Sequence, residues 1–342
     1  FQSTVATVLA QVVAVVLALV GFGPWALVAQ LVVTQGIAGV LAWVGARWRP
    51  SWEFSPRIMG TMARFGSQVV AVDLMSTTRI MLEAAIITNT LGAAALGYLS
   101  IAQRLVQVAQ DVGAAAMVPV STVVFAKVKD SITRLRAGYV RALRIGYAAV
   151  APLLTFVAVD APAIIPLVFG DGWEPSIPVT QALSIAAILI LGAMIDTGLH
   201  YGIGAPGRWF LYQLTVDVLM VGTTFVLARH GLVGVAVGSM GMAMIATMIR
   251  WVLVGRLIDY PVRSMAGGFV VSMIPVMVSG LGGLGVRELT SELPGLVGLG
   301  LVGLTVALLH VLTLRVVSRR VLADVLGLLP LPKPLAPIRK LA

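Results

Sequence analysis

The sequence contains no cysteine among its 342 residues, and only 11% of its residues are charged. The absence of cysteine excludes disulfides, thiolate metal sites and a cysteine nucleophile. The three histidines lie far apart in the sequence, whereas a metal site needs clustered ligands. A P-loop pattern is also absent, which excludes ATP binding by that route. We therefore expect no metal and no cofactor.

Apolar residues fill the chain instead: 59% of residues are hydrophobic and the mean hydropathy is +0.99. The apolar runs are continuous and about 20 residues long, which is the length of a helix that crosses a bilayer. Transmembrane β-strands would alternate apolar and polar residues. The composition therefore predicts an all-α fold, a polytopic transmembrane helical bundle. The net charge of +10 follows membrane topology, so we expect no nucleic-acid partner.

Ten hydrophobic segments can be counted, and the turns between them are rich in glycine and proline. The predicted segments are Thr4–Phe22, Trp25–Val44, Ile58–Thr88, Leu96–Val118, Ala142–Val159, Pro178–Ile203, Trp209–Ala228, Leu232–Val254, Met265–Leu284 and Gly295–Val316.

The basic residues sort onto alternate loops when the start of the first segment is placed in the cytoplasm. Loops on that side carry most of the arginine and lysine, with Arg250 counted among them, whereas the opposite loops carry only Arg229 and Arg287. This asymmetry predicts that both ends of the chain are cytoplasmic, and it supports the count of ten. The basic segment Lys127–Arg144 is interpreted either as an amphipathic helix against anionic headgroups or as a plain topology determinant.

The third segment carries ionised residues at bilayer depth: Asp73, Arg79 and Glu83. Such residues are costly in lipid and usually face a protein interior or a water-filled cavity. Arg79 and Glu83 are four residues apart and share one helix face, and Asp73 points about a third of a turn away. We expect this helix to form one wall of a polar, partly cationic cavity. The alternative is an ion pair that only holds helices together.

Other segments carry polar stripes at helical spacing. Arg104, Gln107 and Asp111 share one face of the fourth segment, with the same structural alternative as the first pair. Asp196 and His200 lie four apart on the sixth segment and could respond to protons or belong to the surface. On the seventh segment, Gln213 and Asp217 are also four apart, and they favour helix-packing hydrogen bonds.

Several stretches resemble a known family. The stretch Phe54–Val112, in particular LGAAALGYLSIAQRL, resembles the seventh and eighth helices of polysaccharide flippases in the multidrug/oligosaccharidyl-lipid/polysaccharide exporter superfamily, in its lipopolysaccharide and O-antigen branch. FGPWALV, APAIIPLVFGDGWEPSIPV and GAPGR match as well. The resemblance implies a bacterial plasma-membrane protein with about twelve to fourteen spans in two six-helix lobes. About four helices would then precede Phe1. One departure is that the family often has an aspartate where Glu83 stands.

The resemblance also implies a division of the chain. Residues 1–50 would be the last two helices of the N-terminal lobe and 51–264 the C-terminal six-helix lobe. Residues 265–318 would be an extra helix pair, which in related flippases lines a groove for a polyprenyl tail. Residues 319–342 would be a proline-rich cytoplasmic tail.

The implied substrate is an undecaprenyl-diphosphate-linked oligosaccharide for surface polysaccharide, turned from the inner to the outer leaflet. Membrane lipids and a polysaccharide polymerase or export machinery are expected as partners, and no enzymatic activity is expected. A cavity arginine can hold a phosphate by charge-assisted hydrogen bonds. The candidates for substrate binding are Arg79, Arg104 and Gln107. The candidates for orienting these groups or coupling transport to an ion are Asp73, Glu83, Asp111, Asp196 and His200.

Two other functions stay open at this point. A multidrug or small-cation exporter of the same superfamily would favour an acidic cavity over a mixed one. A membrane glycosyltransferase or polymerase using the same lipid carrier generally needs a sizeable outer loop with catalytic acids or arginines. The longest outer connection, from Asp160 to about Pro178, is short and contains no arginine.

Overall fold

The computed structural model describes residues 2–23, 25–46, 55–291 and 293–328. Helices make up nearly all of these ranges, and no strand occurs in them. The helices are α1 (Gln2–Leu19), α2 (Trp25–Ala46), α3 (Pro56–Leu91), α4 (Ala93–Val128), α5 (Ile132–Phe169), α6 (Ser176–Ile190), α7 (Ala193–Gly202), α8 (Pro206–Leu227), the short 3₁₀ helix η1 (Ala228–His230), α9 (Gly231–Leu257), α10 (Val262–Leu289), α11 (Gly295–Val317) and α12 (Arg319–Leu328).

The chain divides into two compact units, Phe1–Met62 and Ala63–Ala342. In the first unit, α1 and α2 form an antiparallel hairpin. Its turn contains Gly21 and Gly23, which have φ angles of 92° and 52°, a region that glycine adopts without strain. Buried alanines recur every fourth residue of α1, as in helices that pack closely within membranes. The four-part division predicted from the resemblance stays a prediction.

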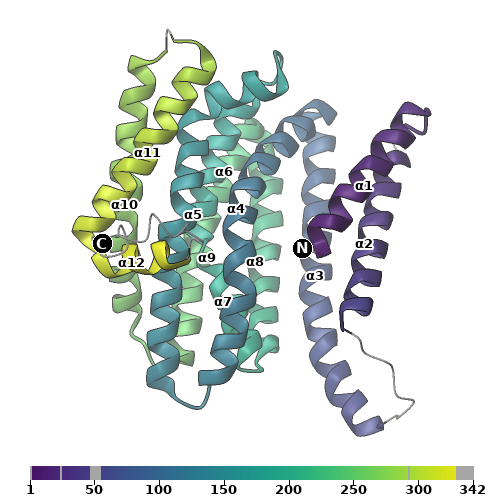
Figure 1. Ribbon diagram of the computed structural model, residues 1–342, viewed down its shortest axis with the longest axis vertical. Helices are drawn as coiled ribbons and strands as arrows, with labels where there is room; N and C mark the ends of the chain where they lie inside the picture. Colours follow the sequence, from purple (N-terminus) through teal and green to yellow (C-terminus); the bar gives the residue numbers. More distant parts are fainter. Residues whose placement is uncertain (1, 24, 47–54, 292, 329–342) are drawn as a thin grey trace. The chain divides into compact units, whose positions relative to one another are not determined.

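The second unit is built around the long helix α5. This helix packs against α4 and α6, and also against α10, α11 and α12; Figure 1 shows α10 and α11 beside it. Its buried side chains run along most of its length, from Tyr139 through Leu154 to Ile165. Three prolines lie inside α5 without ending it. In membrane helices, neighbouring helices can satisfy the backbone groups that proline leaves free.

The polytopic helical fold predicted from composition is confirmed. Eight of the ten predicted segments lie within the helices given above, whereas Thr4–Phe22 extends beyond the end of α1 and Pro178–Ile203 is divided between α6 and α7. Within the described residues, six stretches are long and apolar enough to cross a membrane, and one of them, Pro206–Leu257, contains both α8 and α9. Large apolar side chains remain exposed along these helices, as expected for surfaces that face lipid.

Two local expectations need correction. The predicted sixth segment is not one helix, because it is broken into α6 and α7 at Leu191 and Gly192. The basic segment Lys127–Arg144 is not a separate amphipathic helix either. It consists of the end of α4, a turn of three residues and the first turns of α5. The sequence pattern did not show that both long helices continue into this basic region.

Polar contacts at the two ends of α5 agree with the predicted alternation of helix direction. Near its start, Arg136 donates to the backbone oxygens of Ile258 and Asp259, just after α9 ends. Near its other end, Arg287 of α10 donates to the backbone oxygen of Val159, with 2.6 Å between nitrogen and oxygen. The basic start of α5 therefore lies beside the end of α9, at one end of the unit. That this end is cytoplasmic stays a prediction.

Gly283 of α10 should prove essential for the packing of α10 on its neighbours. A Cβ atom at this position would lie 2.8 Å from Val306 of α11 and 3.4 Å from Val159 of α5. Gly283→Leu is therefore expected to cost about 1–3 kcal/mol through overpacking, measured by thermal unfolding in detergent. Gly285→Leu is the matched control, because a Cβ there would contact nothing within 4 Å. Equal stabilities of the two variants would contradict this packing.

Candidate functional site

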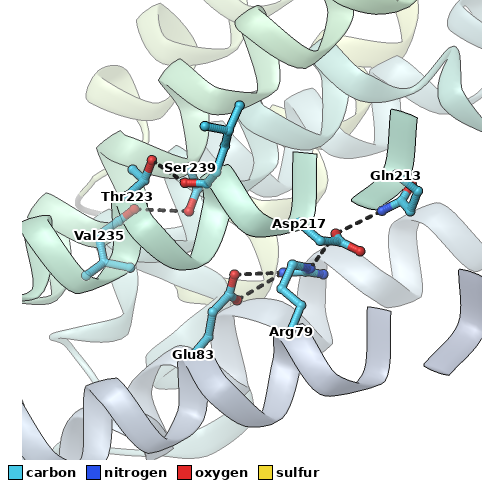
Figure 2. A network of polar contacts seen from close by, with 8 residues as sticks. Arg79, Glu83, Gln213, Asp217, Thr223, Val235 and Ser239 are labelled. Carbon is cyan, nitrogen blue, oxygen red and sulfur yellow. Dashed lines mark hydrogen bonds and ion pairs between the residues drawn. The ribbon is translucent and has the colours of Figure 1, made fainter. Parts of the chain in front are cut away.

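A cavity of about 400 Å³ lies within the second unit, between α3, α4, α6, α8 and α9. Its polar wall is built around Arg79 of α3. The Nη1 atom of Arg79 lies 2.9 and 3.0 Å from the two carboxylate oxygens of Glu83, one turn along the same helix. The Nε atom of Arg79 lies 3.0 Å from Oδ1 of Asp217 on α8. Figure 2 shows Arg79 between these two carboxylates.

Glu83 and Asp217 are buried, being 7% and 4% exposed, whereas the side chain of Arg79 is 25% exposed. Gln213 donates to Asp217 Oδ1 across 2.9 Å, while Asp217 Oδ2 is buried and accepts no hydrogen bond. One guanidinium therefore faces two carboxylates. With both carboxylates ionised, these three side chains would carry a net charge of −1.

The remaining walls of the cavity are neutral. From α4, Gln103, Gln107 and Gln110 line it with amide groups, which both donate and accept hydrogen bonds. From α9, small residues line it, including Ser239, whose hydroxyl donates to the backbone oxygen of Val235. The cavity thus combines one ionic wall with amides that suit polyhydroxylated groups.

The structure brings only part of the predicted set together. Arg79, Glu83 and Gln107 line the cavity. Arg104 is exposed and does not line it. Asp111 is exposed and accepts a hydrogen bond from Gln107, with 2.7 Å between Nε2 and Oδ1.

Two further predictions concern residues outside this cavity. Asp73 is exposed on α3, and its backbone oxygen accepts a hydrogen bond from the hydroxyl of Thr77. Asp196 and His200 are fully buried in α7 and do not line the cavity. His200 Nδ1 lies 2.8 Å from the backbone oxygen of Asp196, so this contact does not use the carboxylate.

The carboxylate of Asp196 pairs instead with Arg250 of α9. Arg250 Nε lies 3.1 Å from Asp196 Oδ2, and both side chains are almost completely buried. Arg250 was counted with the loop residues, but it lies in α9, seven residues before the helix ends. One feature of the sequence could have predicted this contact. Asp196 lies in an apolar segment, and a buried aspartate there requires a cation nearby.

This buried pair lies at the break between α6 and α7. A Cβ atom on Gly192 would lie 2.8 and 2.9 Å from the two terminal nitrogens of Arg250, so only glycine leaves room for this guanidinium. The backbone oxygen of Leu189, near the break, accepts a hydrogen bond from the hydroxyl of Thr247 across 2.8 Å. The hydroxyl of Tyr147 lies 3.4 Å from the same oxygen. Side chains of α5 and α9 thus satisfy the backbone where the helix is interrupted.

Within the described residues, no three histidine or acidic side chains come together in a way that could hold a metal ion. In the cavity wall, the two carboxylates face the guanidinium of Arg79.

Residues 1–178 match the family model described as "Polysaccharide biosynthesis protein". The chain belongs to this family. Among its relatives, the lipopolysaccharide biosynthesis protein WzxC of Escherichia coli (strain K12) is 24% identical over 209 residues, or 60% of this chain and 42% of WzxC. The teichuronic acid biosynthesis protein TuaB of Bacillus subtilis (strain 168) is 27% identical over 166 residues, or 48% of this chain and 34% of TuaB.

A third relative is the succinoglycan biosynthesis transport protein ExoT of Rhizobium meliloti (strain 1021). It is 24% identical over 221 residues, or 64% of this chain and 44% of ExoT. The chain therefore spans less than half the length of these curated relatives. Its fold is similar to that of the lipid II flippase MurJ in an inward closed conformation, with a TM-score of 0.64 and 14% identity. That match covers 92% of this chain and 66% of MurJ.

A double-mutant cycle should detect the contact between α3 and α8. We expect Arg79→Met and Asp217→Asn each to lower stability, and the double variant to lose less than the sum of the two. The expected coupling energy is about 0.5–3 kcal/mol, as for side chains in one polar network. Unfolding of the purified protein in detergent measures it. Additive losses would contradict the contact, and Arg208→Met on α8, with an exposed side chain, is the control for loss of an arginine.

Removing Arg250 should be more damaging, because it leaves the carboxylate of Asp196 buried without a cation. Arg250→Met is expected to cost about 3–5 kcal/mol. The double variant Asp196→Leu/Arg250→Met is expected to recover most of this loss, and Arg256→Met, on an exposed part of the same helix, should change stability little. Melting curves of the four proteins test this, and a double variant no more stable than Arg250→Met would refute the pairing.

Proposed function

We propose that this protein is a flippase that turns an undecaprenyl-diphosphate-linked oligosaccharide from the inner to the outer leaflet for surface polysaccharide synthesis. Its family membership, the names of its relatives and the MurJ-like fold support this proposal. The observation that carries it is the position of Arg79, partly exposed on the ionic wall of a cavity inside a membrane helix bundle. Diphosphate and sugar groups cannot cross hydrocarbon without such a polar surface.

Arg79 is the proposed phosphate-binding group. Its planar guanidinium can donate two parallel hydrogen bonds to a phosphate, which a lysine ammonium cannot do in the same geometry. Gln107, with Gln103 and Gln110 beside it, supplies amide donors and acceptors for sugar hydroxyls. Arg104 stays a proposed second contact for the phosphates from outside the cavity, and Asp111 its proposed orienting partner through Gln107.

The shortage of one positive charge in the network suggests how transport is coupled to an ion. In the resting arrangement Glu83 and Asp217 share the guanidinium of Arg79. Uptake of a proton or a monovalent cation by one carboxylate would weaken its hold on Arg79 and release the guanidinium for phosphate. Alternating access would then link release of that cation to release of the lipid-linked sugar. Asp73, Asp196 and His200 stay proposed as secondary positions in this coupling.

One observation favours a second function. Two carboxylates against one guanidinium make an acidic wall, which suits a small cationic substrate. Export of small cations or drugs is therefore the alternative proposal.

The chain is a multi-pass membrane protein, and its named relatives come from bacteria, which places it in the bacterial plasma membrane. Membrane lipids surround it there. A polysaccharide polymerase or other export machinery is the proposed partner on the outer side, where the flipped oligosaccharide is extended.

Replacement of Arg79 in the chromosomal gene tests the flippase proposal. Arg79→Gln is expected to lower export of surface polysaccharide at least about tenfold, because a charge-assisted contact to the diphosphate is lost. Arg79→Lys should retain part of the export. Arg208→Gln is the control for loss of an exposed arginine, and Arg104→Gln asks whether the second arginine takes part.

Immunodetection in the membrane fraction shows that each variant is present. Normal export by Arg79→Gln would refute the role of Arg79 in phosphate binding. Loss of resistance to cationic compounds with unchanged polysaccharide export would instead support the cation exporter.

A further inference from the structure

A second polar cavity lies far from Arg79 in the fold, where α12 crosses the first turns of α5. It is an open groove of about 700 Å³. Four arginines line it, but only one acidic residue does, Asp324. The arginines are Arg136, Arg141, Arg144 and Arg320. Such an excess of guanidinium groups around one concave surface attracts an anion.

Two of these four arginines are already paired. Arg141 forms a two-pronged contact with Asp324, in which Nε lies 2.9 Å from Oδ2. Arg136 contacts the side chain of Asp259 across 3.4 Å, in addition to two backbone oxygens. Arg144 and Arg320 have no carboxylate partner among the residues that the structure describes. These two guanidinium groups are therefore available to an external ligand.

The groove adjoins a second, apolar cavity of about 160 Å³ between α5, α10, α11 and α12. The two cavities share Arg144 and Val321 in their walls. Apolar side chains such as Leu314 and Val317 line the inner cavity. His310 also lines it and is 2% exposed, with backbone groups of Ala148 and Pro275 next to its ring. The inner cavity therefore joins a largely apolar space to the arginines of the groove.

We propose that this groove binds a membrane phospholipid with an anionic phosphate headgroup. The phosphate lies between Arg144 and Arg320, where guanidinium groups can donate paired hydrogen bonds to it. The glycerol ester region lies beside Arg144 and Val321, which both cavities share, and the start of an acyl chain occupies the apolar cavity. The exposed apolar side chains at the end of α11, such as Val316, extend this surface toward lipid. This site does not depend on the proposed transport cavity, with which it shares no lining residue.

The apolar inner cavity favours a lipid over soluble phosphate as the source of the anion. A free phosphate ion would use the arginines and leave the inner cavity without an occupant. A phospholipid uses both surfaces, with its charge at the arginines and its hydrocarbon in the inner cavity. The same reasoning excludes a neutral lipid, because it would leave the arginines without a counter-charge.

Native mass spectrometry of the purified protein in detergent tests the proposal. Three probes are titrated: dioleoyl phosphatidic acid, dioleoylglycerol with the same chains and no phosphate, and inorganic phosphate. Phosphatidic acid is expected to bind at least about tenfold more tightly than dioleoylglycerol, as two charge-assisted contacts imply. Arg144→Gln/Arg320→Gln should abolish this preference. Arg208→Gln/Arg256→Gln, which removes two exposed arginines outside the groove, should retain it.

Val317→Trp separates the two sources of phosphate, because a larger side chain fills the inner cavity and leaves the arginines in place. It should weaken phosphatidic acid binding and leave inorganic phosphate unaffected. If Val317→Trp leaves phosphatidic acid unaffected while phosphate competes with it, the ligand is a free anion and the lipid proposal is wrong. Equal binding of phosphatidic acid to the wild type and the glutamine pair would also overturn it. Arg320→Gln alone gives the same comparison if the pair cannot be purified.

Discussion

A guanidinium inside an apolar helix bundle needs a carboxylate as its partner. Two such ion pairs join helices of the second unit. Arg79 joins α3 to α8 through Asp217, and Arg250 joins α9 to α7 through Asp196. Neither arginine could stay in lipid alone without a large desolvation cost. The two contacts differ in exposure. The pair at Arg250 is closed off from water and suits structure, whereas Arg79 opens onto a cavity and can exchange partners.

Helix α8 links the two charged regions. Tyr212 is buried in a cluster with Trp209, and its hydroxyl approaches the backbone oxygen of Ala246 on α9. The next residue, Gln213, points to the cavity and holds Asp217. A shift of α8 that moved Asp217 away from Arg79 would therefore also disturb the packing beside the buried pair. The cavity at Arg79 and the packing beside the buried pair therefore share this helix.

The composition of the sequence and the spacing of its residues predicted much of this arrangement. The apolar runs predicted the helices, and a spacing of four residues predicted the contact between Arg79 and Glu83. Spacing along one helix cannot identify a partner on another helix, so the contact of Arg79 with Asp217 was not found. Arg250 was counted with the loop residues although the predicted segment Leu232–Val254 includes it, so its contact with Asp196 was missed. The break at Gly192 was missed because it lies in a continuous apolar run without proline.

The buried pair of Asp196 and Arg250 also constrains how the protein is made. As the chain leaves the ribosome, α7 emerges with a carboxylate whose partner lies on α9, two long helices later. Until α9 arrives, the carboxylate of Asp196 has no cation nearby, which makes the transfer of α7 into lipid less favourable. We therefore expect α7 to settle in the bilayer only when the synthesis of α9 supplies Arg250.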